Sequence, residues 1–494
     1  MSEKSAQENP EKALLLGAGT RRDVWAETER LIENYVTTVA DRPVVTEMTL
    51  PEVRDLLARV DFAKPLLPLD ALRLAAEGLA RTQVNVGHPR YFGLFNPAPT
   101  TMGIAADTLV AALNPQLAVW KHAPFAVEVE NFLIRAFGER FGYSPGEVDG
   151  TFASGGSEAN HTALLTALTA KFPRWQSEGL RALAAQPVFY VSSESHHSFH
   201  KMARLTGLGD ESVRIIPVDA KLRMDVPALR SAIQDDRRRG FAPFMVVATV
   251  GTTSAGVIDP LPELAEAAAS ENLWLHADAA WGGAAALVPE LRPLLNGIER
   301  ADSITLDAHK WLSVPIAAGV YLTRHADILG RTFQIAAAYV PPKADGVEDP
   351  LAHSLQWSRR FIGLKLFLSL SVAGWDGYAQ AMRHMTEMGA ELRRELAANG
   401  WNIANATPLP VVCFTDARNP QRNSAEELEA IVRDVVSSGH AWISTTRIGA
   451  GQPVLRACIT NYRTTAEDLN ILIRALEDAR QRLTNSAANK TSAD

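Results

Sequence analysis

One lysine of this sequence stands where a solvated lysine is unusual. Lys310 lies in the stretch SITLDAHKWLSVP, between a histidine and a tryptophan and just after a short apolar run that is typical of a strand. A half-buried lysine can supply a neutral amine, and a neutral amine is a nucleophile that forms a Schiff base with a carbonyl compound. The alternative is a structural lysine whose stem packs at a strand end while its ammonium group reaches water. The rest of the chain must therefore supply the other parts of a Schiff-base site.

A glycine-rich turn is the first of those parts. In TFASGGSEANHTALLTAL, small residues that include Gly156 and Ser157 lead into an amphipathic helix. The start of a helix carries unpaired N–H groups and the positive end of the helix dipole, and both favour a bound phosphate. A plain glycine turn with a serine cap has the same composition, so this stretch alone leaves both interpretations open.

A carboxylate at the end of an apolar strand is the second part. Asp278 lies in LWLHADAAWGG, where a buried charge is costly unless it is paired. A protonated pyridine nitrogen is a suitable partner, because the ion pair keeps the ring of pyridoxal phosphate cationic and able to accept electrons. The rival is a metal held by His276 and Asp278, but no third ligand is evident. The cluster HHSFH (His196, His197, His200) has no cysteine partner that would complete a zinc site.

A third apolar strand, in VVATVGTTSAGVIDP, ends in Gly251, Thr252 and Thr253. Open α/β sheets bind ligands at the C-terminal ends of their strands, where small and hydroxyl residues leave room and supply polar contacts. Each of these stretches is a weak signal by itself. Because each follows a predicted strand, together they indicate one cofactor site, and no metal is expected in it.

The elements that would position these residues follow from the pattern of apolar runs. Between about residues 100 and 370, runs such as PVFYVSS, FMVVATV and LWLHADA alternate with amphipathic stretches, which predicts a mostly parallel sheet buried on both faces. The first hundred residues are mostly helical in pattern. The last part predicts helix, strand, helix, strand, helix and then a disordered tail, TNSAANKTSAD. We expect a helical segment over residues 1–98, a large α/β domain over 99–372 and a small α+β domain over 373–494.

Composition excludes several classes of protein. The 494 residues carry a net charge of −7, with 47% apolar and 21% charged residues and no basic stripe, so nucleic acid is not an expected partner. Two cysteines cannot build a disulfide framework, which fits a reducing compartment. No apolar run approaches the length that crosses a bilayer, and the polar N-terminus does not resemble a signal peptide. These features predict a soluble cytoplasmic protein.

Five motifs occur in a fixed order along the chain: SGGSEAN, SHHS, GTTSAG, HADAAWGG and DAHKW. Together they resemble the group II pyridoxal-phosphate-dependent decarboxylases, the relatives of the aromatic-amino-acid, histidine and glutamate decarboxylases. The resemblance extends from about His88 to the C-terminal helix. It implies the type I (aspartate aminotransferase-like) fold and pyridoxal 5'-phosphate as the cofactor. It also implies a homodimer with its active sites at the interface, in which the N-terminal segment packs on the partner.

The resemblance assigns roles to individual residues. Lys310 would form the internal aldimine with the cofactor, and Asp278 would pair with the pyridine nitrogen. His197 would stack on one face of the ring, with Ala280 near the other face and Thr253 beside the ring. The phosphate would be held by three residues of two motifs: Gly156, Ser157 and His309.

The resemblance also points to a substrate pocket, formed in part by the neighbouring subunit. Its lining would come from an aromatic segment and from the stretch LNPQLAVWKHAP: Tyr91, Phe92, Phe95, Gln116 and Trp120. We therefore expect a free L-amino acid as the substrate, with an aromatic side chain favoured. An acidic side chain is the alternative, because it could be received by Arg90, Lys121 and His122.

A loop near residue 350 departs from the family pattern. Relatives usually carry a loop tyrosine that protonates the substrate carbon after CO2 leaves, and here the aligned position holds Leu351. Either His353 or Tyr339 replaces this donor, or protonation is slow and oxygen attacks, giving an aldehyde and ammonia. Decarboxylation to the amine is our first expectation, with oxidative decarboxylation–deamination as the alternative. A further alternative is an aminotransferase or a non-catalytic cofactor-binding protein. A nicotinamide dehydrogenase is not supported, because the sequence has no G-x-G-x-x-G turn after its first predicted strand.

Overall fold

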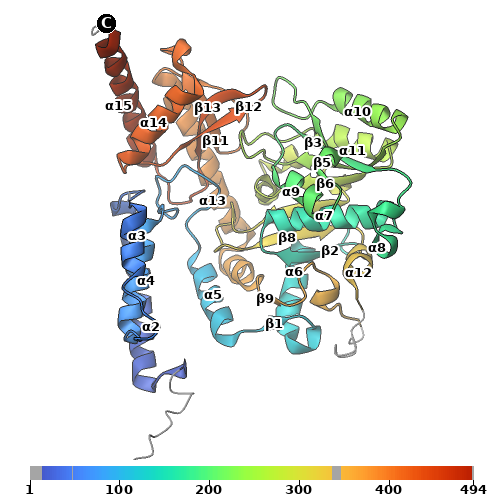
Figure 1. Cartoon of the computed structure of the whole chain (residues 1–494), viewed down its shortest axis with the longest axis horizontal. Coiled ribbons are helices and arrows are strands. Elements are labelled where there is room, and N and C mark those ends of the chain that lie inside the picture. Colours follow the sequence, from blue (N-terminus) through green and yellow to red (C-terminus); the bar gives the residue numbers. More distant parts are fainter. Residues whose placement is uncertain (1–13, 47, 336–345, 492–494) are drawn as a thin grey trace, which may run out of the picture.

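A seven-stranded sheet forms the centre of the large domain (Figure 1). The structure is a computed structural model that describes residues 14–46, 48–335 and 346–491. The strand order across the sheet is β2 (Asp149–Ala153), β8 (Gly319–Thr323), β7 (Ser303–Asp307), β6 (Trp274–Asp278), β5 (Ala242–Thr249), β3 (Pro187–Ser192) and β4 (Val213–Ile216). The five strands from β7 to β4 pair in parallel, while β8 is antiparallel to both of its neighbours. The prediction of a mixed, mostly parallel sheet is confirmed.

Helices cover both faces of this sheet, which is why its strands are apolar throughout. In β5, Val247 packs in a cluster with α7 (Gly156–Lys171) and α9 (Ser198–Leu205), whereas Val246 and Ala248 pack with α6 (Pro124–Phe141), α10 (Val226–Arg238) and α11 (Leu261–Ser270). Successive side chains of a strand point to opposite faces, so a strand with two covered faces needs an uninterrupted apolar run. Two short helices, α8 (Trp175–Glu178) and α12 (Ile328–Phe333), complete the layer beside α7.

The small domain is an antiparallel sheet covered by helices. Its strand order is β10 (Trp401–Ile403), β11 (Val411–Asp416), β13 (Gln452–Cys458) and β12 (Ser444–Ile448), with α14 (Ala425–Ser437) and α15 (Ala466–Thr491) packed on it. The sequence predicted only β11 and β13, because β10 and β12 are short and less apolar. α13 (Leu364–Ala398) links the two domains and is broken at Gly374, beside the boundary predicted at residue 373.

The C-terminal helix is longer than expected. The segment TNSAANKTSAD was expected to be disordered, but α15 continues to Thr491 and includes most of it. The segment contains alanine and lysine and no glycine or proline, so nothing in it stops a helix that is already formed.

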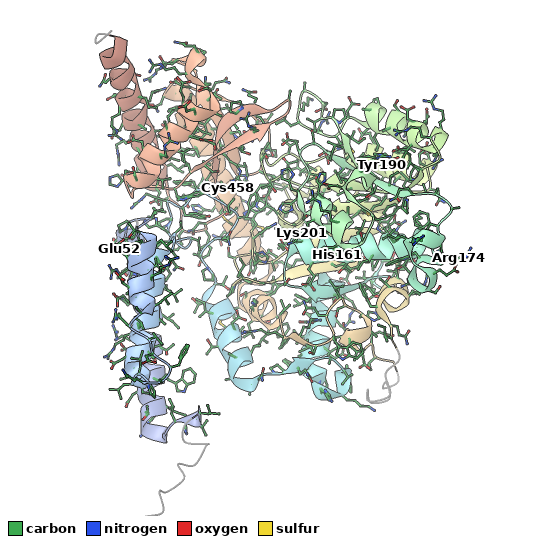
Figure 2. The ribbon with its side chains drawn as sticks, viewed as in Figure 1. Glu52, His161, Arg174, Tyr190, Lys201 and Cys458 are labelled. Atoms are coloured by element: carbon green, nitrogen blue, oxygen red, sulfur yellow. The ribbon has the colours of Figure 1, made fainter. Side chains whose placement is uncertain are left out.

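The N-terminal helices project away from the rest of the chain. α2 (Ala18–Thr38), α3 (Leu50–Leu57) and α4 (Pro68–Thr82) form an elongated arm in Figure 1, and in Figure 2 many of its side chains, Glu52 among them, point into open space. α5 (Thr101–Leu113) then packs along α13, and a two-residue ribbon pairs β1 (Gln116–Leu117) with β9 (Arg359–Arg360). Among the helices that the structure describes, none combines the length and apolar character needed to span a membrane.

Candidate active site

A cavity of about 400 Å³ opens where β5, β6 and β7 end and α7 begins. The C-terminal ends of parallel strands meet at one edge of a sheet, and the first residues after them therefore come together. Seven residues predicted for the cofactor site line this cavity: Gly156, Ser157, Thr253, Asp278, Ala280, His309 and Lys310. The wall also contains residues that the sequence analysis did not single out, of which Asn160, Trp281 and Asp307 make informative contacts.

Lys310 is held by a carboxylate that sequence reasoning missed. Its Nζ lies 2.9 Å from Oδ2 of Asp307, the last residue of β7, and the Asp307 side chain is 2% exposed. This ion pair aims the lysine amine along the cavity wall and brings a proton acceptor next to it. The spacing Asp-x-x-Lys in DAHKW was visible in the sequence, but only the turn after β7 brings the two side chains together.

The carboxylate of Asp278 accepts a hydrogen bond from the side-chain amide of Asn160. Nδ2 of Asn160 donates to Oδ2 of Asp278 at 2.9 Å, and the backbone N–H of Ala280 donates to Oδ1 at 3.2 Å. Asp278 is 5% exposed and carries no lysine or arginine partner among the described residues. A buried carboxylate with only hydrogen-bond donors behind it is suited to pair with a cation that enters the cavity.

The start of α7 forms a cradle for a phosphate. Its N-cap, Gly155, makes no side-chain capping bond, so the first N–H groups of this 16-residue helix are available to a ligand. A Cβ atom at position 156 would lie 2.7 Å from Oδ2 of Asp307, and one at position 155 would lie 3.3 Å from Cε1 of His309. Position 156 therefore requires glycine, and position 155 leaves little room for a side chain.

His309 presents a donor to this cradle. The N–H of Ala318 donates to Nδ1 of His309 at 3.0 Å, so the neutral ring carries its proton on Nε2. Burial lowers the pKa of His309, which favours this neutral form. The glycine cradle, the helix start and this Nε2–H together fit a phosphate group, while Lys310 and Asp278 fit an aldehyde and a pyridine nitrogen. The residues present therefore fit pyridoxal phosphate.

The histidine next to the cavity is not the one expected. The sequence prediction placed His197 against the cofactor ring, but among the described residues that line the cavity the structure has His196 and not His197. Both histidines are exposed in one chain, and His197 is the N-cap residue of α9. Nδ1 of His196 lies 2.8 Å from Oγ of Ser198, which holds this ring toward the cavity, and partial desolvation by the surrounding residues lowers the pKa of His196. Two adjacent histidines in a turn point in different directions, and the sequence offers no means of choosing between them.

Phe95 is the aromatic residue of the predicted substrate set that lies closest to Lys310. Its ring stacks on Trp281 with centroids 4.5 Å apart, and Nζ of Lys310 lies 6.0 Å from its centre. The guanidinium group of Arg456, another residue that the sequence analysis missed, lies 5.0 Å from the same ring. Arg456 is 2% exposed and donates to the carbonyl oxygens of Thr253 at 2.9 Å and Gly93 at 2.7 Å.

The other predicted substrate residues lie elsewhere within one chain. Tyr91 and Phe92 pack on the small domain, where Tyr91 contacts Trp442 and Phe92 joins the domain core. Gln116 pairs with β9, the N–H of Trp120 donates to Asp349, and Leu351 packs in a small apolar cluster with Ala118 and Val119. None of these five is among the described residues that line the Lys310 cavity. Their role in a pocket shared with a second subunit stays a prediction.

His353 lines a different cavity, of about 240 Å³, between α6, β2 and the segment from residue 346. Its Nε2 lies 3.2 Å from Oδ2 of Asp149 and its Nδ1 lies 3.7 Å from Oε2 of Glu348. Within one chain the structure does not bring His353 to Lys310. The other proposed donor, Tyr339, lies outside the described residues. No group of three or more potential metal ligands occurs in the described part of the chain.

Comparison with known proteins identifies the family. The model of the pyridoxal-dependent decarboxylase conserved domain matches residues 54–416. The chain belongs to this family. It is 30% identical over 464 residues to an aromatic-L-amino-acid decarboxylase of Bacillus atrophaeus, which covers 92% of this chain and 94% of that protein. It is 32% identical over 408 residues to an L-2,4-diaminobutyrate decarboxylase of Rhizobium meliloti (strain 1021), with coverage of 81% and 80%.

The fold of the decarboxylase is confirmed by solved structures. The structure of Oryza sativa TDC with PLP and tryptamine matches it with a TM-score of 0.88 at 24% identity, over 95% of this chain and 99% of that one. The type I fold predicted from the motifs is therefore correct. The family match and the fitting donor set establish pyridoxal phosphate as the cofactor and the protein as a carboxy-lyase that acts on an amino acid.

Proposed function

We propose that this decarboxylase converts a free L-amino acid, with an aromatic side chain favoured, into the corresponding amine and CO2. The observation that carries the proposal is the convergence of Lys310, Asp278 and the first turn of α7 on one cavity. Pyridoxal phosphate, when bound, supplies an aldehyde carbon that condenses with an amine and a cationic ring that takes up electron density from the substrate Cα.

The residues of the chain would divide the work as follows. Lys310 would hold the cofactor by its Nζ, and Oδ2 of Asp307, 2.9 Å away, would hold that amine in position by ion pairing. Asp278 keeps a proton on the pyridine nitrogen by ion pairing. His196 takes the stacking role that the sequence analysis gave to His197. The residues that would position the ring and its phosphate are Gly156, Ser157, Thr253, Ala280 and His309.

The preference for an aromatic substrate rests on two observations. Trp281 lines the cavity and Phe95 stacks on it, so the wall beside Lys310 offers aromatic faces to a substrate ring. One relative is an aromatic-L-amino-acid decarboxylase. Arg90, proposed as a receiver for an acidic side chain, instead bonds to the carbonyl of His440 and lies 3.5 Å from Asp468 of α15. The relative that acts on 2,4-diaminobutyrate makes this compound the first competitor to test.

A product balance tests both the substrate and the reaction. The purified holoenzyme is incubated in air with tryptophan, tyrosine, phenylalanine, 2,4-diaminobutyrate and glutamate, and CO2, amine, aldehyde, ammonia and peroxide are measured. We expect the highest kcat/KM for an aromatic amino acid and one amine for each CO2. Turnover confined to diaminobutyrate or glutamate would contradict the aromatic preference and leave the decarboxylase intact.

Leu351 supports a second candidate reaction, oxidative decarboxylation–deamination. By the family resemblance it takes the position of a proton-donating tyrosine, and a leucine side chain carries no proton that it could donate. Aldehyde and ammonia in place of amine would establish this reaction. In that case Leu351→Tyr is expected to shift the products toward amine, with Leu351→Phe as the size-matched control that lacks the hydroxyl.

We also propose that the enzyme is a homodimer. The N-terminal arm exposes large apolar side chains, and monomeric proteins rarely expose contiguous apolar patches of that kind. These side chains are 59–98% exposed at the following positions: Trp25 (59%), Leu50 (60%), Leu57 (67%), Phe62 (98%), Leu67 (71%) and Leu79 (61%). Ile316, which lines the Lys310 cavity, is also 64% exposed, so a second chain on this side would complete the site.

Sedimentation equilibrium tests the dimer. The wild-type protein is expected to show twice the chain mass of 53.7 kDa at micromolar concentration. Leu57→Glu combined with Leu79→Glu places charges on the arm and is expected to raise the dimer dissociation constant at least about tenfold, because each buried charge must be desolvated. Leu205→Glu, at an equally exposed leucine of α9, is the control. A fully active wild-type monomer would exclude the proposal.

Location in the cytoplasm is a further proposal. Cys413 and Cys458 are both buried and form no disulfide. Thiols stay reduced in a reducing compartment such as the cytoplasm, and the low number of cysteines agrees with that location. Fractionation of source cells with antibodies to the protein tests this location.

A further inference from the structure

A chain of buried polar side chains lies behind Asp278 and is not accounted for by the cofactor contacts. The indole nitrogen of Trp274 lies 2.9 Å from Oγ of Ser303, and that Oγ lies 2.8 Å from Nδ1 of His276. Nε2 of His276 lies 3.0 Å from Oδ1 of Asn160, whose Nδ2 donates to Asp278 at 2.9 Å. All five residues are at most 5% exposed.

Packing of three elements creates this chain. Trp274, His276 and Asp278 alternate along one face of β6, Ser303 begins the neighbouring strand β7, and Asn160 lies in the first turns of α7 above them. Oγ1 of Thr305 is also near Nε2 of His276, but at 3.5 Å it is the weaker partner. Buried polar groups at this density are retained only when each has a partner.

The chemistry of the groups gives the chain a direction. An ionised carboxylate can only accept, so the amide NH2 of Asn160 faces Asp278 and its Oδ1 faces Nε2 of His276. The proton of the neutral ring is then on Nε2 and is donated to the amide oxygen of Asn160, which turns the amide NH2 toward Asp278. The reverse arrangement would place the amide oxygen against the carboxylate, and that contact is tolerable only if Asp278 is protonated.

The burial of His276 supports this direction. The ring is completely buried, and burial lowers the pKa of His276 to about 4, so it stays neutral and carries a single N–H across the working range of most enzymes. A neutral ring with its N–H on Nε2 holds the amide of Asn160 in place without adding a charge behind the carboxylate.

We propose that His276 is a positioning residue that acts through Asn160 to hold Asp278 as an ionised acceptor facing the cofactor ring. The inference rests on the role proposed for Asp278. It assigns a function to the histidine of the motif HAD and to the asparagine of SGGSEAN, which neither the cofactor shell nor the substrate pocket uses. The chain of donors stabilises the negative carboxylate and fixes the plane in which its lone pairs lie.

Two substitutions of His276 separate this role from packing. In His276→Gln the amide nitrogen can reach the place of Nε2 and still donate to Asn160, whereas in His276→Asn the shorter side chain can replace only Nδ1 and leaves Asn160 without its donor. Both introduced residues are neutral amides. Tyr190→Phe, which removes the buried 3.0 Å hydrogen bond from Tyr190 of β3 to Asp236 of α10, is the control for loss of a buried polar contact outside this chain.

The readouts are the dissociation constant of pyridoxal phosphate from the apoenzyme, kcat and KM separately, and the melting temperature. For His276→Asn we expect cofactor affinity and kcat to fall about 10- to 100-fold with little change in KM, because a hydrogen bond to a charged group is lost. For His276→Gln we expect cofactor affinity and kcat to stay within about threefold of the wild-type values, because the amide N–H replaces the imidazole N–H as donor. Tyr190→Phe should change the melting temperature alone.

A pH profile adds a signature that packing does not produce. In His276→Asn the acidic limb of cofactor binding should move to higher pH, because the ionised form of Asp278 has lost support. The other titratable groups that face this carboxylate, His196, Asp307 and Lys310, are unchanged in every variant. Equal behaviour of the Gln and Asn variants would overturn the proposal for His276. A normal Asp278→Asn enzyme would overturn the role of Asp278 itself, so the two failures are distinguishable.

Discussion

Replacing Lys310 by alanine is expected to lower turnover by roughly 10⁴-fold or more and to abolish covalent attachment of the cofactor. Lys310 is the one lysine among the described residues that line the cavity, and Asp307 holds its Nζ there at 2.9 Å. No other described amine is placed to take over. The measurement is borohydride reduction of the protein with pyridoxal phosphate, followed by mass mapping of the labelled peptide.

The matched control for this experiment is Lys201→Ala, because Lys201 is an exposed lysine on α9 that does not line the cavity (Figure 2). The control should be labelled at Lys310 and should turn over normally. A Lys310→Ala enzyme that is still labelled within the cavity, or that keeps more than about 1% of its turnover, would show that another amine carries the cofactor.

Replacing Asp278 by asparagine is expected to cost about 10²- to 10⁴-fold in turnover. Removal of one partner of a buried ion pair costs ~3–5 kcal/mol, and each ~1.4 kcal/mol is a factor of ten in rate. The substitution keeps the size of the side chain but removes the negative charge that would hold a proton on the pyridine nitrogen. Asn160 and the N–H of Ala280 then face an amide in place of a carboxylate.

Single-turnover kinetics and cofactor binding together check this prediction. The chemical step should slow by the full factor, while the protein should still bind pyridoxal phosphate through Lys310 and the cradle at the start of α7. Asp302→Asn, the same change at the opposite ends of β6 and β7, should leave the rate of the chemical step within about twofold, since this side chain lies at the end of the sheet away from the cavity. Near-normal chemistry in the Asp278→Asn enzyme would falsify the proposed role.

Much of the large domain was predictable because its strands are buried on both faces. A strand such as β5 must be apolar at every position, and this leaves a strong local signal. β2 left no such signal: it is five residues long and contains Gly150, where a Cβ atom would lie 2.3 Å from the carbonyl oxygen of Tyr321. Its place at the edge of the sheet depends on that close approach and not on its composition.

The cofactor site was predictable to the extent that its parts are local. A glycine turn before a helix, an aspartate after a strand and a lysine after another strand each carry their own chemistry, and seven such residues line the cavity. The exchange of His197 for His196 shows the limit of that approach. Adjacent residues share a motif but not a direction, and the direction is set by the bond from His196 to Ser198 at the start of α9.

The sequence by itself determined the class of this protein: the order of its motifs, the family, the cofactor and the lysine and aspartate that would serve it. The tertiary structure decided which distant side chains support them. Asn160 meets His276 across 116 positions of the chain, and Arg456 meets Gly93 across 363. Such contacts depend on how α7 packs on the sheet and how the small domain meets the N-terminal segment. Motif residues can be recognised from their neighbours in the sequence, whereas long-range contacts form only when the whole core packs.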